Sequence, residues 1–473
     1  MKSIIIYISV FYIFAGCQRQ EQVLETTRRA QPLSPEENLR EANFPPQDID
    51  DNTTNDKSSQ SNFLKACLDP EISTAMANTV RAILDSLAET DCLISDLRLR
   101  TVTQLTVIAA RGNEENSTPL PIDLSLLRGI NNNLGALGIL GSTSDISILG
   151  QFSNLETLYI SIPNLTNQEM TIIESMSTLR TFGISGAAIT NTESISKLIN
   201  LENLFIQNSQ VSDIETLSSL AQLTRLDIDR NQITDITALA ALTNLRRIEL
   251  AFNQVSDLSP IAQLTGLETL GLFQNNISDL SSLSNLSDLK ILSIGSNPIE
   301  AGLASISIST NLEVIDISNT GTTTLSPLAE LAGLKTLIAN DNDINDLTPL
   351  QDLMSLEIIV LNNNSVTDLT PITNLSALAE LHLNQNAIEG SFPLLDLANL
   401  KTLDIANNQL DDVSNVGTVQ SLSALNIANN QITDISAFEN LTALQYIDIS
   451  GNDIADSSVL DELPILTTVV SNQ

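Results

Sequence analysis

The residue types that most often perform chemistry in proteins are scarce in this chain of 473 residues. It has three cysteines and one histidine, which are too few for a metal cage of Cys and His ligands or for a thiol relay. We expect the histidine, His382, to be non-catalytic, because a lone histidine without a positioned nucleophile or acid partner rarely acts in catalysis. The sequence predicts no cofactor.

Cys17 stands at the end of a segment that is typical of export. Residues 1–16 carry one basic residue, a nearly unbroken apolar stretch and then small residues, which is the layout of a signal peptide and too short to span a membrane. The sequence FAGC that ends at Cys17 resembles the lipobox of bacterial lipoproteins, in which the cysteine is acylated and becomes the new N-terminus. We therefore expect lipid attachment at Cys17. The alternative is an ordinary secretory signal with an incidental cysteine.

Residues 17–62 form the next segment of the chain. They are rich in Gln, Glu, Asn, Thr, Ser and Pro and hold few large apolar side chains, so they cannot bury enough surface to fold. As a flexible coil, about 45 residues would span on the order of 40 Å. We interpret them as a disordered tether in a protein exported to the bacterial cell envelope, at the outer membrane or the cell surface.

Residues 63–104 are predicted to form a helical cap. The sequence DPE that begins at Asp69 is typical of a helix start, and apolar residues from Ile72 to Leu87 follow at spacings of three and four. Their apolar stripe would cover the open first turn of the stacked units that follow.

Cys67 and Cys92 flank this helix. In an exported protein, two such cysteines favour a disulfide. A straight helix from Pro70 to Ala88 would be about 27 Å long, a distance that the few flanking residues could barely cover. The disulfide therefore requires the helix to end early, near Asp85.

The remainder, residues 105–473, is organised by a repeat of 22 residues, seen most clearly in the unit from Leu223 to Asn244. About seventeen units of the form LxxLxLxxN can be indexed. A unit this short cannot bury its own apolar side and must be stacked on its neighbours. The fourth and sixth residues would face inward from a short strand, and successive strands would run parallel.

Two polar columns follow the repeats. An Asn ends each strand motif, where its amide can satisfy buried backbone groups, so these asparagines are predicted to be structural. An Asp recurs twelve residues after the first Leu of many units, where a short helical turn would begin on the outer side, which is typical of N-capping. The column of carboxylates could also bind calcium, but capping explains it without an ion, and no metal site is predicted.

These units resemble the bacterial leucine-rich repeat proteins of the internalin type, with units of the form LxxLxLxxNxIxDIxxLxxL. The resemblance covers roughly residues 64–473. It implies an α/β solenoid, a right-handed horseshoe with a concave parallel β-sheet, short 3-10 or irregular turns on the convex side and a helical N-terminal cap. It also implies that the concave face binds other proteins. The anchor is expected at the N-terminus rather than in a C-terminal wall-anchoring motif.

Outward-facing strand positions are the ones that stacking leaves free for function. Read by column, they predict two patches that would bind a partner. The first holds Arg and aromatic side chains, the types enriched at binding hot spots, in a chain short of both. Its residues are Phe205, Arg225, Arg230, Arg247, Phe252 and Phe273. The second holds aliphatic side chains that should face water, namely Ile291, Val314, Ile338, Ile358 and Val360.

Each patch also has a structural interpretation. In the first, Arg225 and Arg247 would only neutralise Asp227 and Glu249. In the second, β-branched residues would simply suit a pleated surface. The two interpretations of each patch make opposite predictions for partner binding.

Net charge and repeat content narrow the function. With 57 acidic and 21 basic residues, the net charge of −36 opposes phosphate backbones, so nucleic acid is excluded as a partner and membrane contact is expected only through the lipid. The repeats leave no room for a catalytic domain, so no enzyme is predicted.

We expect a surface-anchored lipoprotein that binds a protein, or a glycan, through its concave face. The alternative is a structural envelope lipoprotein that self-associates through its last turn, LPILTTVVSNQ, although the strongly acidic C-terminal end argues mildly against it.

Overall fold

The computed structural model describes residues 62–69, 72–87, 92, 99, 103–108, 121–128, 134–143, 145–299, 302–391, 393–394 and 397–471. The predicted signal peptide with Cys17 and almost all of the predicted tether lie outside these residues. Two compact units divide the chain: one, the N-terminal unit, ends at Val255, and the other, the C-terminal unit, begins at Ser256. No helix among the described residues is both long and apolar enough to cross a membrane.

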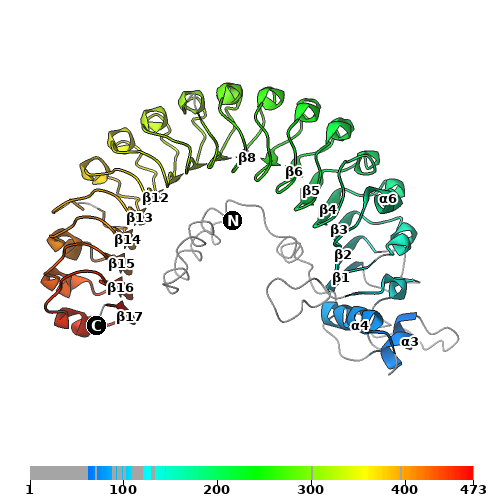
Figure 1. Cartoon of the computed structure of the whole chain (residues 1–473), viewed down its shortest axis with the longest axis horizontal. Helices are drawn as coiled ribbons and strands as arrows, with labels where there is room; N and C mark the ends of the chain where they lie inside the picture. The colour runs from blue at the N-terminus through cyan, green and yellow to red at the C-terminus, as the bar shows by residue number, and fades with distance from the viewer. Residues whose placement is uncertain are drawn as a thin grey trace. The chain divides into compact units, whose positions relative to one another are not determined.

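Among the described residues, the helices α3 (Asn62–Leu68) and α4 (Thr74–Ser86) precede the repeats. The prediction that the helix starts at Pro70 is wrong, because Ser73 provides the N-cap: its hydroxyl accepts a hydrogen bond of 3.2 Å from the backbone N–H of Met76. Val80 and Ile83 of α4 are buried, and the helix packs against the first strand of the sheet (Figure 1).

Cys67 and Cys92 form a disulfide, with 5.8 Å between their Cα atoms. The later start of α4 makes this possible. Cys67 lies in α3 rather than in a loop before α4, and α4 ends at Ser86, close to the early end that the bridge requires. The bridge thus joins α3 to the chain that follows α4.

In the N-terminal unit, seven parallel strands pair in chain order and lie on the concave side, with 3-10 turns on the convex side (Figure 1). The strands are β1 (Gln104–Ile108), β2 (Ala136–Leu140), β3 (Thr157–Ser161), β4 (Thr181–Ser185), β5 (Asn203–Gln207), β6 (Arg225–Asp227) and β7 (Arg247–Glu249). The turns are η1 (Leu124–Leu127), η2 (Ser147–Gln151), η3 (Thr171–Ser175), η4 (Ile195–Lys197), η5 (Glu215–Ser219) and η6 (Thr237–Ala241), with one short helix, α6 (Asn167–Met170).

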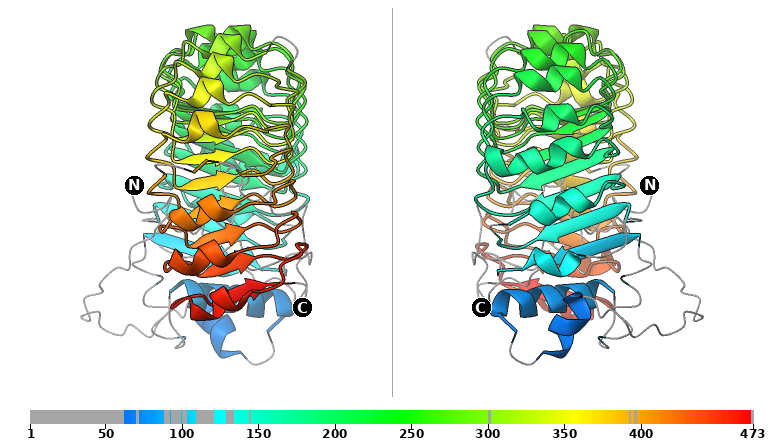
Figure 2. Two further views of the ribbon diagram at one scale, coloured as in Figure 1. Left: turned by 90° about the vertical axis from the view of Figure 1, so that its left-hand side faces the viewer. Right: turned by 90° about the vertical axis from the view of Figure 1, so that its right-hand side faces the viewer.

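The C-terminal unit repeats this pattern with ten parallel strands, stacked one on the next in the side views of Figure 2. They are β8 (Thr269–Gly271), β9 (Ile291–Ser293), β10 (Val314–Asp316), β11 (Thr336–Ile338), β12 (Ile358–Val360), β13 (Glu380–His382), β14 (Thr402–Asp404), β15 (Ala424–Asn426), β16 (Tyr446–Asp448) and β17 (Thr468–Val470). The turns are η7 (Ser259–Ile261), η8 (Ser281–Asn285), η9 (Ala304–Ile306), η10 (Ser326–Leu328), η11 (Thr348–Leu350), η12 (Thr370–Ile372), η13 (Ser414–Thr418), η14 (Ser436–Asn440) and η15 (Ser458–Glu462). The predicted stack of parallel strands and short 3-10 turns is confirmed.

The recurring Asn has the structural role that the sequence predicts. The amide nitrogen of Asn231 donates to the carbonyls of Ile206, Ile228 and Asp229 at 2.7, 3.0 and 3.0 Å. Its carbonyl oxygen accepts from the backbone N–H of Val211 at 3.2 Å. One side chain therefore satisfies buried backbone groups of two consecutive units.

The recurring Asp caps the 3-10 turns. The carboxylate of Asp235 accepts hydrogen bonds from the backbone N–H of Thr237 at 2.8 Å and from its hydroxyl at 2.6 Å. These two bonds hold the pKa of Asp235 below its usual value, and the bond from the hydroxyl has the larger effect. Among the described residues, no group of three or more His, Cys, Asp or Glu side chains could hold a metal ion.

Candidate partner-binding face

Two columns of side chains run across the concave face of the N-terminal unit. Strand pairing places Tyr159, Gly183, Phe205, Asp227 and Glu249 next to one another on β3 to β7. The adjacent column contains Asn203, Arg225 and Arg247 on β5 to β7. We call Tyr159, Phe205, Arg225, Asp227, Arg247 and Glu249 the Arg–aromatic cluster.

Gly183 allows the two rings of the cluster to approach each other. A Cβ atom on Gly183 would lie only 2.2 Å from Cδ1 of Tyr159, so the Tyr159 ring fills the space above this glycine. The ring crosses β4 and its centre lies 5.8 Å from the centre of the Phe205 ring. Any side chain at position 183 would therefore displace Tyr159 from Phe205.

Arg225 stacks on this aromatic pair. Its guanidinium carbon lies 4.6 Å from the centre of the Phe205 ring, a cation–π arrangement. Burial lowers the pKa of Arg225, and the charge of Arg247 lowers it further. Within the part of the chain that the structure describes, the guanidinium of Arg225 donates no hydrogen bond and forms no ion pair, and its Nε–H is buried.

Arg247 is held differently from Arg225. Its Nη2 lies 2.9 Å from Oε1 of Glu249, whose side chain is only 3% exposed, whereas 34% of the Arg247 side chain is exposed. Asp227 instead accepts a hydrogen bond of 2.8 Å from Nε2 of Gln207. Arg247 therefore forms a direct ion pair with a carboxylate, whereas Arg225 is attracted by Asp227 and Glu249 without a direct ion pair to either.

The carboxyl groups of the cluster lie beneath the guanidinium groups. Asp227 is fully buried and Glu249 is 2% exposed. Burial raises the pKa of Asp227 to about 6 and that of Glu249 to about 7, because a carboxylate loses its hydration in the protein interior. Burial also raises the pKa of the adjacent Asp229. The hydrogen bond of 2.6 Å that Asp229 accepts from the N–H of Ala251 lowers this pKa, but by less than burial raises it. Near neutral pH the acidic layer of this face is only partly charged.

Arg230 and Phe252, from consecutive repeats of the N-terminal unit, form a second contact. Both adopt left-handed backbone conformations, with φ of 55° and 57°. In other units the same position is held by Gly, Asn, Asp, Ser or Gln. The Arg230 guanidinium lies 3.9 Å from the centre of the Phe252 ring. Two bulky residues thus occupy strained backbone positions, which in proteins often accompany functional sites.

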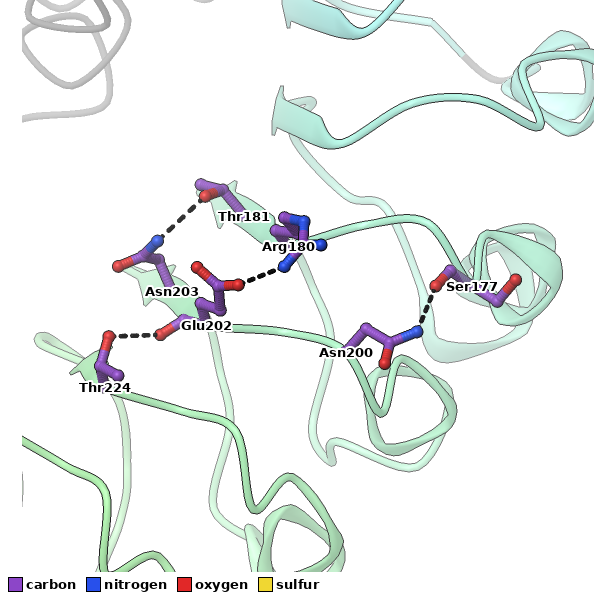
Figure 3. A network of polar contacts seen from close by, with 7 residues as sticks. All are labelled: Ser177, Arg180, Thr181, Asn200, Glu202, Asn203 and Thr224. Atoms are coloured by element: carbon purple, nitrogen blue, oxygen red, sulfur yellow. Dashed lines mark hydrogen bonds and ion pairs between the residues drawn. The ribbon is translucent and has the colours of Figure 1, made fainter.

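A network of polar contacts lies at one edge of this face (Figure 3). Asn203 donates a hydrogen bond of 3.1 Å to the Thr181 hydroxyl, and Arg180 pairs with Glu202. Arg180 is 59% exposed, so it bears a positive charge outside the Arg–aromatic cluster. It offers a matched control for substitutions within the cluster.

The remaining candidate residues lie in the C-terminal unit. Phe273 belongs to this unit, where its ring lies against Gly295. The second patch is only partly as predicted. Ile291, Val314 and Ile358 follow one column and are partly exposed.

The prediction that outward side chains face water is wrong for four of the predicted partner-binding residues. They are Phe205, Phe273, Ile338 and Val360, with exposures of 5%, 8%, 7% and 8%. Neighbouring strands lie only about 4.8 Å apart, so each large side chain is covered by others of its own and adjacent columns. Ile338, for example, lies in register with Val360.

His382 has carboxylates around it rather than a nucleophile. Its Nε2 lies 3.8 Å from Oε2 of Glu380. Burial works against protonation, but the nearby carboxylates of Glu380 and Asp404 together raise the pKa of His382 above its usual value. This arrangement stabilises a charged histidine.

Tyr159 and Gly183 are parts of this face that the sequence did not predict. Tyr159 lies in a unit with irregular spacing, and a glycine at an outward position has no obvious meaning in the sequence. The signal that could have found them is the column itself, since Tyr159 and Gly183 precede Phe205 at equivalent positions of consecutive units.

Comparison with known proteins supports the repeat assignment. A family model described as leucine rich repeat matches residues 398–454, and one described as leucine rich repeats in two copies matches residues 221–263 and 376–417. A comparison with curated proteins found no match.

Solved structures with the same fold include three from different organisms. An internalin, InlF, of Listeria monocytogenes is 24% identical, with 84% of this chain and 96% of that chain covered and a TM-score of 0.53. The leucine-rich repeat protein LIC12759 of Leptospira interrogans is 23% identical, with coverages of 79% and 96% and a TM-score of 0.66. The Arabidopsis receptor kinase HAESA, in complex with the peptide hormone IDA and the co-receptor SERK1, is 19% identical, with coverages of 75% and 68% and a TM-score of 0.53. The chain therefore carries leucine-rich repeats and folds as a leucine-rich repeat solenoid similar to that of Listeria internalins.

Proposed function

We propose that this protein is a non-enzymatic, lipid-anchored protein of the bacterial cell envelope that binds another protein through the concave face of its N-terminal unit. The observation that carries the proposal is Arg225, which stacks on Phe205 while its hydrogen-bond donors stay unused within the described residues. Arg and aromatic residues are the types that dominate binding energy at protein interfaces. A pre-positioned Arg loses less side-chain freedom when a partner binds.

The covering of the aromatic rings favours a protein over a glycan. Carbohydrate recognition would need an open ring face on which a sugar could stack. Phe205 is 5% exposed, and its face is occupied by Arg225. The side chains that this face presents are guanidinium groups, which suit the polar and charged groups of a protein.

The fold is compatible with a binding role. HAESA, which shares the fold, was solved with a peptide hormone and a co-receptor bound. The anchor rests on the sequence of residues 1–17 alone. Acylation at Cys17 and a tether over residues 17–62 would present the solenoid away from the membrane surface.

A capture experiment tests the proposal. The full-length protein would be compared with a Phe205→Ala, Arg225→Gln, Arg247→Gln variant in pull-downs from envelope or host-cell extract. A Lys290→Gln, Lys335→Gln variant serves as a control, because these lysines belong to the C-terminal unit, are 49% and 47% exposed and pair with Glu268 and Glu313. We expect the control to keep the captured protein and the cluster variant to lose it. Retention by a folded cluster variant would refute this face as the binding site.

A second candidate function is self-association in the envelope. It is favoured by the exposed apolar side chains of the last described turn, since Ile465, Val469 and Val470 are 45%, 47% and 38% exposed. Charge opposes self-association, because no Lys or Arg follows Lys401 and two copies of this acidic end would repel each other. Size-exclusion chromatography over a range of concentrations separates the two: a monomer throughout contradicts self-association.

A further inference from the structure

Arg225 and Arg247 bring two positive charges together. They occupy paired positions on the adjacent parallel strands β6 and β7. Strands are about 4.8 Å apart, and like charges placed opposite one another in a sheet repel. Such a pair is stable only where negative charge compensates both guanidinium groups.

The compensation within the chain is incomplete. Glu249 pairs with Arg247, but no carboxylate within the described residues pairs with Arg225. The Nε–H groups of both arginines are buried and have no acceptor. Asp227 and Glu249 attract Arg225 electrostatically, but neither forms an ion pair or a hydrogen bond with it: Asp227 accepts from Gln207, and Glu249 pairs with Arg247. The donors that remain unsatisfied on this face are thus guanidinium groups.

From this imbalance we infer that the partner protein presents an acidic side chain to this face, and that its carboxylate binds Arg225 and Arg247 together. The inference rests on the proposed function, because it names the partner chemistry of the same site. The planar fork of guanidinium donors matches a carboxylate, and the Phe205 ring holds one fork in place before binding.

The distribution of charge along the chain supports an acidic partner at this face. Arg230 and Arg246, both exposed, lie in the same two units of the repeat as Arg225 and Arg247. After Arg247 the sequence contains only three basic residues, Lys290, Lys335 and Lys401. In a chain with a net charge of −36, these neighbouring arginines form a local positive surface.

Protonation of the buried carboxyl groups tunes this binding. The charged groups that face Glu249 are Arg247 on its own strand, Asp227 and Arg225 on β6, and Asp229 just after β6. The pKa of Glu249 is about 7 and that of Asp227 about 6, so both take up protons as the pH falls from about 8 to about 6. The carboxylates of an acidic peptide, with a pKa near 4.3, stay ionised over this range. Loss of the competing negative charge strengthens binding at the lower pH.

Fluorescence anisotropy with labelled hexaglutamate and hexalysine peptides tests the inference on the full-length protein. A salt concentration of about 0.15 M limits the reach of the overall negative charge to about 8 Å. We expect hexaglutamate to bind and Arg225→Gln to weaken it about tenfold, the effect of losing a charge-assisted hydrogen bond. Arg180→Gln removes the same charge outside the cluster and should change the affinity less than about twofold.

Glu249→Gln keeps the inference testable even if an Arg225 variant fails to fold. Glutamine keeps an oxygen for Arg247 but cannot ionise, so this variant should bind hexaglutamate at about pH 8 more tightly than the unaltered protein does at that pH. Binding of hexalysine in preference to hexaglutamate, or an unchanged affinity in Glu249→Gln, would overturn the inference. In that case loss of the captured protein from the cluster variant would still support the proposed function.

Discussion

The guanidinium of Arg230 lies 3.9 Å from the centre of the Phe252 ring, and both residues hold a left-handed backbone conformation. Elsewhere in the chain this position is filled by glycine, an amide, Asp or Ser. Side chains with a large Cβ substituent tolerate this conformation poorly, whereas Asn tolerates it well. The stacked pair thus combines a local backbone cost with a specific contact.

Phe252→Asn separates these two effects. The substitution removes a cation–π contact of about 0.5–1 kcal/mol and relieves backbone strain of at least about 1 kcal/mol. We therefore expect the free energy of unfolding in urea to change by less than about 1 kcal/mol, while capture of the partner protein weakens. Ser296→Asn, at the equivalent position of another unit, should alter neither. Unchanged capture by Phe252→Asn would place this pair outside the binding surface.

Two polar substitutions in one repeat unit should differ in cost. Asn231→Ala removes the partner of the Val211 N–H and one donor to each of three buried carbonyls, of which those of Ile228 and Asp229 keep bonds from Asn253 and Asn208, so it should cost about 2–4 kcal/mol. Asp235→Ala removes an exposed cap of one 3-10 turn and should cost about 1 kcal/mol. Urea denaturation measures both. Equal costs would contradict the bridging role of the asparagine between consecutive units.

The repeat positions were predictable because stacking alone determines them. Residues such as Leu226, Ile228 and Asn231 have one possible environment in a stack of short units, and the structure places them there. The helix start near Asp69 was mispredicted because Ser73 provides the competing N-cap, and sequence spacing does not decide between two nearby caps.

The face was less predictable because its properties depend on neighbours across strands. Gly183 acquires a role only through the Tyr159 ring that lies above it. Phe205 stands at an outward position yet is buried by Arg225 and Tyr159. The columns of outward positions in the sequence therefore locate candidate residues, whereas the exposure of their side chains and the contacts between them are known only from the folded structure.

Replacement of Cys17 tests the membrane anchor. Cys17→Ala removes the thiol that would be acylated, so we expect the variant to fractionate as a soluble protein while the unaltered protein sediments with membranes. Metabolic labelling with a radioactive fatty acid should mark only the unaltered protein. Cys67→Ala serves as the control, because that thiol belongs to the disulfide with Cys92. Equal membrane recovery of Cys17→Ala would contradict lipid anchoring at this residue.

The stability of the fold should fall as the pH rises from about 5 to about 8. Glu249 has a folded-state pKa of about 7, raised from 4.5 by burial, so the folded state holds the proton more tightly than the unfolded state does. The resulting stabilisation is fully present below the unfolded pKa and is lost as the pH rises through the folded pKa, a difference of up to about 3 kcal/mol. Asp227, with a pKa of about 6, acts in the same direction.

Urea denaturation at several pH values, with Glu249→Gln as the comparison, measures this effect. The variant cannot ionise at position 249 and should lose much of the decline between about pH 5 and 8. The capping carboxylates do not contribute to the change in stability between about pH 5 and 8. Hydrogen bonds from the residues that they cap lower the pKa of Asp235 and Asp346, so their contribution is lost only as the pH falls below about 4. A decline of equal size in the variant and the unaltered protein would show that Glu249 is not its source.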